Sequence, residues 1–122
     1  MIAIIDDDVA VREATRSLLN SLGYITAMFA SAEEFLRSYN RGEMSCIISD
    51  VQMPGMSGLA LQQRLIADQQ RIPIIFITGF PNDDARERAL SAGAQGFLTK
   101  PYTEQSLISN IESALQSNLK SG

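Results

Sequence analysis

The sequence contains no histidine, and this absence removes several common classes of active site. Ser-His-Asp and Cys-His catalysis need an imidazole as the general base, and histidine is a frequent zinc ligand. The single cysteine, Cys46, has no second cysteine with which to form an internal disulfide. Because it precedes Ile47 and Ile48, we expect Cys46 to be a small core residue in a strand and not a nucleophile.

Long apolar segments and runs of basic residues are also missing. No segment approaches the roughly 20 apolar residues of a membrane-spanning helix, and the N-terminus lacks the basic and apolar regions of a secretory signal. The net charge is −4, which is atypical of a domain that binds nucleic acid directly. We therefore expect a cytoplasmic domain that contacts neither a membrane nor nucleic acid.

Short apolar segments are present instead, and they alternate with longer amphipathic ones. A length of 122 residues, 45% of them hydrophobic, suits one globular domain. Continuous apolar segments are typical of strands that are covered on both faces. These predicted strands span residues 2–5, 25–29, 46–49, 74–77 and 96–99.

The segments between the predicted strands repeat their apolar residues at helical spacing. These residues are Val11, Ala14, Leu18 and Leu22; Ala32, Phe35, Leu36 and Tyr39; Leu61 and Leu65; Ala85 and Ala89; and Leu107, Ile111 and Leu115. Suitable N-caps precede the last four helices: Ser31, Ser57, Asn82 or Asp83, and Thr103 or Glu104. Five strand–helix units in succession predict an α/β fold, with a parallel sheet and helices on both of its faces.

The two ends of the chain suggest a piece of a longer protein. The first predicted strand begins almost at residue 1, and the last residues are mostly polar. We expect one domain over residues 1–117, followed at 118–122 by the start of a linker or tail.

Polar side chains follow four of the five predicted strands. Asp6 and Asp7 follow the first strand, Asp50 the third, Thr78 the fourth and Lys100 the fifth. In an open parallel sheet, ligands bind beyond the carboxyl ends of the strands. We therefore expect these five side chains to meet at one edge of the sheet.

Three carboxylates that meet in this way repel one another, and burial strengthens the effect. Such a cluster needs protons or a cation, and oxygen ligands with room for water favour Mg²⁺, with Mn²⁺ as a second option. A cation, the Lys100 ammonium and the Thr78 hydroxyl around Asp50 would suit an incoming phosphoryl group. A carboxylate can serve as the nucleophile and form an aspartyl phosphate.

Each of these residues also has a simpler explanation. Asp8 is well placed to cap the first helix, Asp50 could be a turn residue before Met53-Pro54-Gly55, and Lys100 could be a solvated surface lysine. Thr78 alone is weak support, since threonine is common at strand ends. The combination favours a site, because separate coincidences would all have to fall on one sheet edge.

These motifs, in this order, resemble the receiver domains of two-component response regulators, especially those of FixJ-type regulators. The spacing is also similar, with 28 residues from Asp50 to Thr78 and 22 from Thr78 to Lys100. The resemblance implies a flavodoxin-like (βα)5 sandwich with strand order 2-1-3-4-5. The matching segments are Ile4-Ile5-Asp6-Asp7-Asp8, the ten residues from Ser49 to Gly58, Ile77-Thr78-Gly79, Ala92-Gly93-Ala94 and Leu98-Thr99-Lys100-Pro101-Tyr102.

The resemblance also implies a role for each acidic residue. Asp50 would be the phosphoacceptor, and Asp7 and Asp50 would bind Mg²⁺ directly together with the backbone carbonyl of Gln52. Asp6 would assist, often through water. The protein would catalyse only its own phosphorylation and dephosphorylation, and would not be an enzyme otherwise.

The remaining implied residues read the phosphoryl group. Thr78 would hydrogen-bond to it, Lys100 would pair with it, and Phe97 would be the aromatic switch residue, unless it is only a packing residue. Gln52 and Phe80 occupy positions that tune dephosphorylation in the family. A bulky Phe80 beside Thr78 would shield the acyl phosphate from water.

The implied partners are a sensor histidine kinase as the phosphoryl donor and a second copy of the chain. The dimer would form through the fourth helix, the fifth strand and the fifth helix after phosphorylation. The output would be control of an effector, namely a DNA-binding transcriptional domain outside this chain.

Three other functions compete with this interpretation. A phosphatase or phosphomutase with an aspartyl nucleophile needs an acid–base aspartate two residues later, where Gln52 stands. A flavodoxin-like cofactor binder needs a Ser-, Thr- and Gly-rich phosphate loop, where three aspartates stand. A receiver in a hybrid kinase or a stand-alone receiver remains open.

Overall fold

Five parallel strands form one sheet in the order β2-β1-β3-β4-β5. The computed structural model describes residues 1–38, 41–80 and 82–121. The strands are β1 (Ile2–Ile5), β2 (Thr26–Phe29), β3 (Cys46–Asp50), β4 (Ile74–Thr78) and β5 (Gly96–Thr99). This order confirms the flavodoxin-like sheet that the family resemblance implies.

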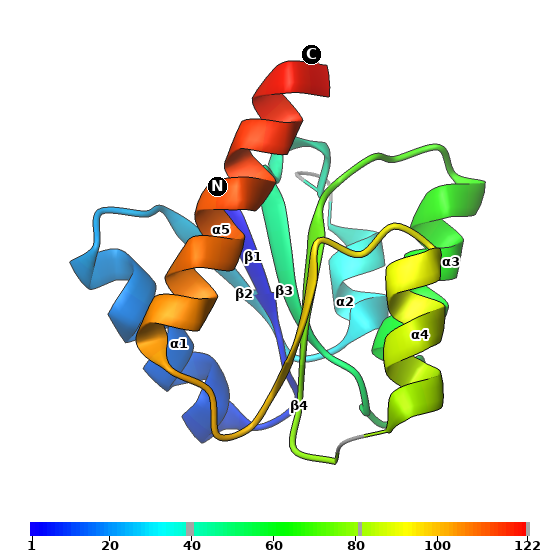
Figure 1. The fold of residues 1–122 in the computed structure, drawn as a ribbon, viewed down its shortest axis with the longest axis horizontal. Coiled ribbons are helices and arrows are strands. Elements are labelled where there is room, and N and C mark those ends of the chain that lie inside the picture. The colour runs from blue at the N-terminus through cyan, green and yellow to red at the C-terminus, as the bar shows by residue number, and fades with distance from the viewer. Residues whose placement is uncertain (39–40, 81, 122) are drawn as a thin grey trace.

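The helices cover both faces of the sheet (Figure 1). They are α1 (Val9–Ser21), α2 (Ala32–Arg37), α3 (Gly58–Ala67), α4 (Asp83–Ser91) and α5 (Glu104–Ser121), with a short 3-10 helix η1 (Arg41–Glu43). In Figure 1, α1 and α5 lie on one side of the sheet, and α2, α3 and α4 lie on the other. The chain therefore has three layers.

The hydrophobic core is divided by the sheet into two halves. Alternate residues of β1 point to opposite faces, so Ala3 and Ile5 pack in one half and Ile2 and Ile4 in the other. The first half includes Phe35, Leu61, Leu65 and Ala89 of α2, α3 and α4. The second includes Leu19, Leu107, Ile111 and Ala114 of α1 and α5. Because both faces are covered, the strands are apolar on both sides, as their sequences predict.

Each helix start is fixed by a side chain that caps it. The Asp8, Ser31, Ser57, Asn82 and Thr103 side chains each accept a hydrogen bond from the backbone N–H three residues later. Such caps satisfy N–H groups that have no partner within the helix. They confirm the predicted caps, and they set the lengths of the loops that leave the carboxyl ends of the strands.

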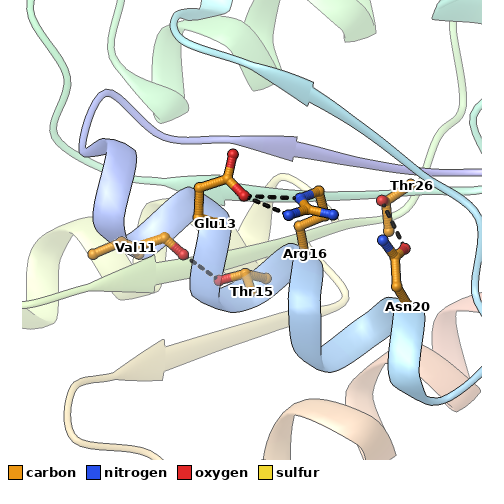
Figure 2. Close-up of polar contacts among 6 residues, drawn as sticks. All are labelled: Val11, Glu13, Thr15, Arg16, Asn20 and Thr26. Atoms are coloured by element: carbon orange, nitrogen blue, oxygen red, sulfur yellow. Dashed lines mark hydrogen bonds and ion pairs between the residues drawn. The ribbon is translucent and has the colours of Figure 1, made fainter.

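Helix α1 is also tied to the edge strand β2. The Thr26 hydroxyl donates to Asn20 Oδ1, near the end of α1, over 3.0 Å. Figure 2 shows this contact. On the same helix, Arg16 pairs with Glu13 at 2.6 Å, and the Thr15 hydroxyl donates to the backbone one turn earlier. A partly exposed ion pair of this kind contributes about 0.3–0.5 kcal/mol to stability. The packing of the buried face of α1 therefore stabilises the position of this helix more than its surface charges do.

Some boundaries differ from the predicted ones. Strand β2 begins at Thr26 and not at residue 25, because the pairing with β1 starts at Thr26; the Ile25 side chain just before it is 71% exposed. Strands β3 and β4 each extend by one residue and include Asp50 and Thr78. Tyr39, predicted to lie on the face of the second helix, is outside the described residues.

The end of the chain is helical as far as it is described. Helix α5 continues to Ser121, through most of the segment expected to be a tail, while Gly122 lies outside the described residues. The boundary at residue 117 stays a prediction. Within the described ranges, no helix has the length and apolar character needed to cross a membrane.

Candidate functional site

Three carboxylates from two neighbouring strands meet at the carboxyl edge of the sheet. Asp6 follows β1, Asp7 is the next residue, and Asp50 ends β3, which pairs directly with β1. One oxygen from each lies within 4.8 Å of the other two. The sequence prediction that these three side chains converge is therefore confirmed.

The carboxylates line a small open cavity of about 280 Å³. Its walls are completed by Asp8, Gln52, Gly79, Phe80 and Lys100. Lys100, which directly follows β5, brings a positive charge to the same cavity, close enough to lower the pKa of Asp6 and Asp50 against the effect of burial. The cavity thus has the charge distribution expected for a cation and an anionic group bound side by side.

The loop after β1 is held in shape by hydrogen bonds to Asp6. The Asp6 carboxylate accepts from the Asp8 N–H at 2.9 Å, and the Asp6 carbonyl accepts from the Arg12 guanidinium at 2.6 Å. The Asp8 carboxylate accepts from the N–H groups of Ala10 and Val11 instead. Asp8 therefore caps α1 and lies outside the carboxylate cluster, which confirms the simpler explanation for this residue.

The loop after β3 is equally tight around Asp50. The Asp50 carboxylate accepts from the Gln52 N–H at 3.2 Å, and the Gly58 N–H donates to the Val51 carbonyl at 2.9 Å. A Cβ atom built on Gly58 would overlap the carbonyl oxygen of Asp50. Glycine at position 58 therefore lets α3 begin directly against the backbone of Asp50.

Burial makes the ionised form of two of these carboxyls unfavourable. It raises the pKa of Asp6 and of Asp50 above the ordinary value, and the nearby carboxylates raise both further. The Asp8 and Gln52 N–H groups and Lys100 act in the opposite direction, but they do not cancel the effect. Partly hydrated carboxylate oxygens of this kind fit a hard divalent cation such as Mg²⁺, which would offset their repulsion.

Thr78 ends β4, and Lys100 directly follows the adjacent strand β5, whose last residue Thr99 pairs with Thr78. Thr78 is 1% exposed, and its hydroxyl accepts from the Phe80 N–H at 3.0 Å. The Lys100 N–H donates to the Thr78 carbonyl at 2.8 Å, and the Lys100–Pro101 peptide bond is cis. Thr78 thus lies behind the cavity wall that Gly79 and Phe80 form.

Phe97 lies on β5 and is half-buried among core residues. Its ring packs beside that of Phe76, with centroids 6.3 Å apart. Among the described residues, neither Phe97 nor Thr78 lines the cavity that holds the aspartates. The structure therefore brings together Asp6, Asp7, Asp50, Gln52 and Lys100, whereas the two expected switch residues do not line the cavity.

Two side chains that support the site were not predicted from the sequence. Arg12 holds the backbone of Asp6, and Glu33 of α2 accepts a hydrogen bond from the Met56 N–H in the loop after Asp50. The sequence offers one signal for Arg12, because this residue lies one helical turn after Asp8, in the helix that follows the aspartates. Glu33 has no such signal, since it lies 23 residues before its partner.

A five-stranded parallel sheet in this order, with an acidic cluster at its carboxyl edge, defines an α/β domain of the flavodoxin-like class. Residues 2–112 match the response regulator receiver domain family, and the chain belongs to that family. It is the receiver domain of a two-component response regulator, a class of phosphoacceptor switches.

Relatives of known name support this assignment. The response regulator protein TodT of Pseudomonas putida is 45% identical over 116 residues, which are 95% of this chain and 51% of TodT. The transcriptional regulatory protein FixJ of Bradyrhizobium diazoefficiens is 37% identical over 115 residues, 94% of this chain and 56% of FixJ. The chain spans about half the length of these curated relatives.

Solved structures show the same fold. The response regulator StyR superposes with a TM-score of 0.90 at 43% identity, over 98% of this chain and 60% of that one. The structure of FixJ-N superposes with a TM-score of 0.85 at 32% identity, over 94% of this chain and 92% of that one.

Proposed function

We propose that Asp50 accepts a phosphoryl group from a sensor histidine kinase in a Mg²⁺-dependent reaction. The observation that carries the proposal is the convergence of carboxylate oxygens from Asp6, Asp7 and Asp50 within 4.8 Å, on a cavity that Lys100 also lines. Asp7 and Asp50 would bind the ion directly with the Gln52 carbonyl, and Asp6 would assist. Mn²⁺ would serve as a substitute.

The chemistry needs one nucleophile and neutralised phosphoryl oxygens. A carboxylate oxygen of Asp50 attacks phosphorus, the bond from phosphorus to the donor nitrogen breaks, and an aspartyl phosphate forms. Bound Mg²⁺ would supply positive charge to the phosphoryl oxygens, and Lys100 would pair with them from the other side. Outside this self-phosphorylation and its reversal by hydrolysis, we expect no enzymatic activity.

The phosphoryl group would then be read by the residues behind the cavity. It adds roughly −1.5 to −2 charges at one point. The Thr78 hydroxyl would leave its contact with Phe80 to donate to a phosphoryl oxygen, and Phe97 would turn toward the vacated space. This is a two-state element that a local charge biases.

The output surface would consist of α4, β5 and α5. Helix α4 suits a movable element, because Ala89 is its one buried residue among those described. The phosphorylated protein would form a homodimer through this surface. Relatives named as transcriptional regulators support a cytoplasmic protein whose DNA-binding effector domain lies outside this chain.

The test combines magnesium, acetyl phosphate and intact-mass measurement. We expect the wild-type chain to gain one phosphoryl group, and Asp50→Asn and EDTA each to abolish the gain. Sedimentation with and without beryllofluoride then tests dimerisation. An unphosphorylated wild-type chain, or a phosphorylated Asp50→Asn variant, would overturn the assignment of Asp50.

Phosphatase chemistry is the competing function, and the same samples distinguish it. A phosphatase would release phosphate over many turnovers and accept several phosphate esters. A receiver would accumulate one acyl phosphate that is labile in alkali. Gln52, which has no ionisable proton for a leaving group, supports the second outcome.

A further inference from the structure

A carboxylate outside the aspartate cluster contacts the loop that follows Asp50. Glu33 lies in the first turn of α2, and its Oε2 atom accepts from the Met56 N–H at 3.0 Å. The loop over residues 51–57 also carries Gln52, whose carbonyl is the backbone ligand in the proposed function. Glu33 thus bridges a separate helix to a segment of the site.

The backbone beside Met56 is shaped around this carboxylate. Gly55 has a φ of +78°, in the left-handed region that favours glycine. A Cβ atom built on Gly55 would overlap Oε2 of Glu33. Two successive residues, 55 and 56, are therefore fitted to one carboxylate group, the first by its missing side chain and the second by its N–H.

The arrangement is costly for stability alone. Among the described residues, the other oxygen of Glu33, Oε1, is buried and has no hydrogen-bond partner. A buried oxygen of a carboxylate that lacks a partner destabilises the fold, and an apolar side chain would avoid this penalty. A residue that serves only packing would not need a charge there, so the contact points to a role in shaping the loop.

The other anchors of this loop lie at its two ends. The Gln52 N–H donates to Asp50 at 3.2 Å, and the Gly58 N–H donates to Val51 at 2.9 Å. Both bonds stay within the segment from Asp50, the last residue of β3, to Gly58, the first residue of α3. The Glu33 contact instead fixes the outer part of the loop to α2.

We propose that Glu33 is a positioning residue for the receiver chemistry. By holding residues 55 and 56, it keeps the loop in the conformation that presents the Gln52 carbonyl to the three aspartates, and so it sets the affinity of the site for Mg²⁺. This role rests on the proposed function, in which that carbonyl is a ligand.

The experiment measures Mg²⁺ affinity by isothermal titration calorimetry, and separately the rate of phosphorylation by acetyl phosphate at increasing Mg²⁺. We expect Glu33→Ala to weaken Mg²⁺ binding about tenfold, the lower end of what loss of an outer ligand contact costs. The rate at saturating Mg²⁺ should stay within about twofold of wild type, because the nucleophile is unchanged. Glu33→Gln should restore the affinity, since its amide oxygen can accept the Met56 N–H.

Glu34→Ala is the matched control. Glu34 is the next residue of α2, and its carboxylate accepts from the Ala30 N–H at 3.3 Å, a local contact at the same helix start. Its removal should leave Mg²⁺ affinity unchanged. A Glu33→Ala variant that binds Mg²⁺ like wild type, or a Glu34→Ala variant that loses as much affinity, would overturn the role of Glu33.

Two further measurements keep the test decisive. The Met56 amide proton should move upfield in Glu33→Ala and return in Glu33→Gln, as an NMR signature of the bond itself. If Glu33→Ala does not fold, Gly55→Ala tests the same contact from the loop side, and an unchanged Mg²⁺ affinity would overturn the proposal. A wild-type chain that takes up neither Mg²⁺ nor a phosphoryl group refutes the proposed function instead, which separates the two failures.

Discussion

Replacing Asp50 with asparagine should stabilise the metal-free protein while it destroys the phosphoacceptor. The asparagine has the same shape, and its oxygen can still accept the Gln52 N–H that Asp50 holds at 3.2 Å. The substitution therefore removes one negative charge from the cluster and changes little else. Its effect on unfolding measures the repulsion among the carboxylates.

The magnitude follows from the separation of the oxygens. Two unit charges at the 4.8 Å limit repel by about 3.5 kcal/mol at an effective dielectric constant of about 20, and by about 0.9 kcal/mol in water. Asp50 is half-buried, and its attraction to Lys100 is lost as well, so we expect a net gain of roughly 1–2 kcal/mol. For 122 residues this raises the melting temperature by about 4–8 °C.

The pH dependence of stability gives the sign of the effect of Asp50→Asn on the free energy of unfolding. Burial raises the pKa of Asp6 and Asp50 above their values in the unfolded chain. The stability these carboxyls contribute is therefore full below about pH 4 and is lost as pH rises through the raised values. The advantage of Asp50→Asn should be largest at pH 7 and should disappear near pH 3.

The assay is thermal unfolding in EDTA and in Mg²⁺, at pH 3 and pH 7. A ligand at ten times its dissociation constant stabilises by about 1.4 kcal/mol, so Mg²⁺ should raise the melting temperature of wild type and raise that of Asp50→Asn much less. The reasoning is refuted if Asp50→Asn in EDTA at pH 7 melts at or below wild type, or if Mg²⁺ stabilises both chains equally.

Three further outcomes test single residues. Burial raises the pKa of the Cys46 thiol to about 12, so it should resist alkylation at pH 8 until urea unfolds the protein, and its contribution to stability should be lost as pH rises from 9 toward 12. Gly58→Ala should lower stability by about 1–3 kcal/mol, measured by urea unfolding, because the new Cβ overlaps the Asp50 carbonyl. Phe80 is 69% exposed at the cavity wall. Phe80→Ala should speed loss of the phosphoryl group severalfold by admitting water, as followed by intact mass. An unchanged rate of loss would contradict the shielding role of Phe80.

The fold was predictable because its signals are local. Apolar runs mark the strands, and Ser31, Ser57 and Asn82 mark helix starts through hydrogen bonds that span three residues. The error at Ile25 arose from the same rule. An isoleucine next to a strand extends the apolar pattern in the sequence. Only the structure shows that Ile25 precedes the strand and that its side chain is 71% exposed.

The aspartate cluster was predictable for a different reason. Parallel strands bring their carboxyl ends to one edge, so Asp6 and Asp50 are placed together once the strands are known. The burial of each side chain could not be predicted from the strand ends alone. Neither Thr78 nor Phe97 lines the cavity in this structure, and their roles in reading a bound phosphoryl group stay predictions.

The Glu33 contact shows what sequence patterns leave out. Its carboxylate resembles any acidic residue in the first turn of a helix, where the helix dipole already explains a negative charge. Gly55 likewise resembles any glycine after a proline. Each explanation is sufficient alone. Only the structure shows that a Cβ atom on Gly55 would overlap the Glu33 carboxylate, so that the carboxylate requires glycine at position 55. An acidic residue that carries a buried oxygen without a partner therefore marks a constraint on the loop and not on the helix that bears it.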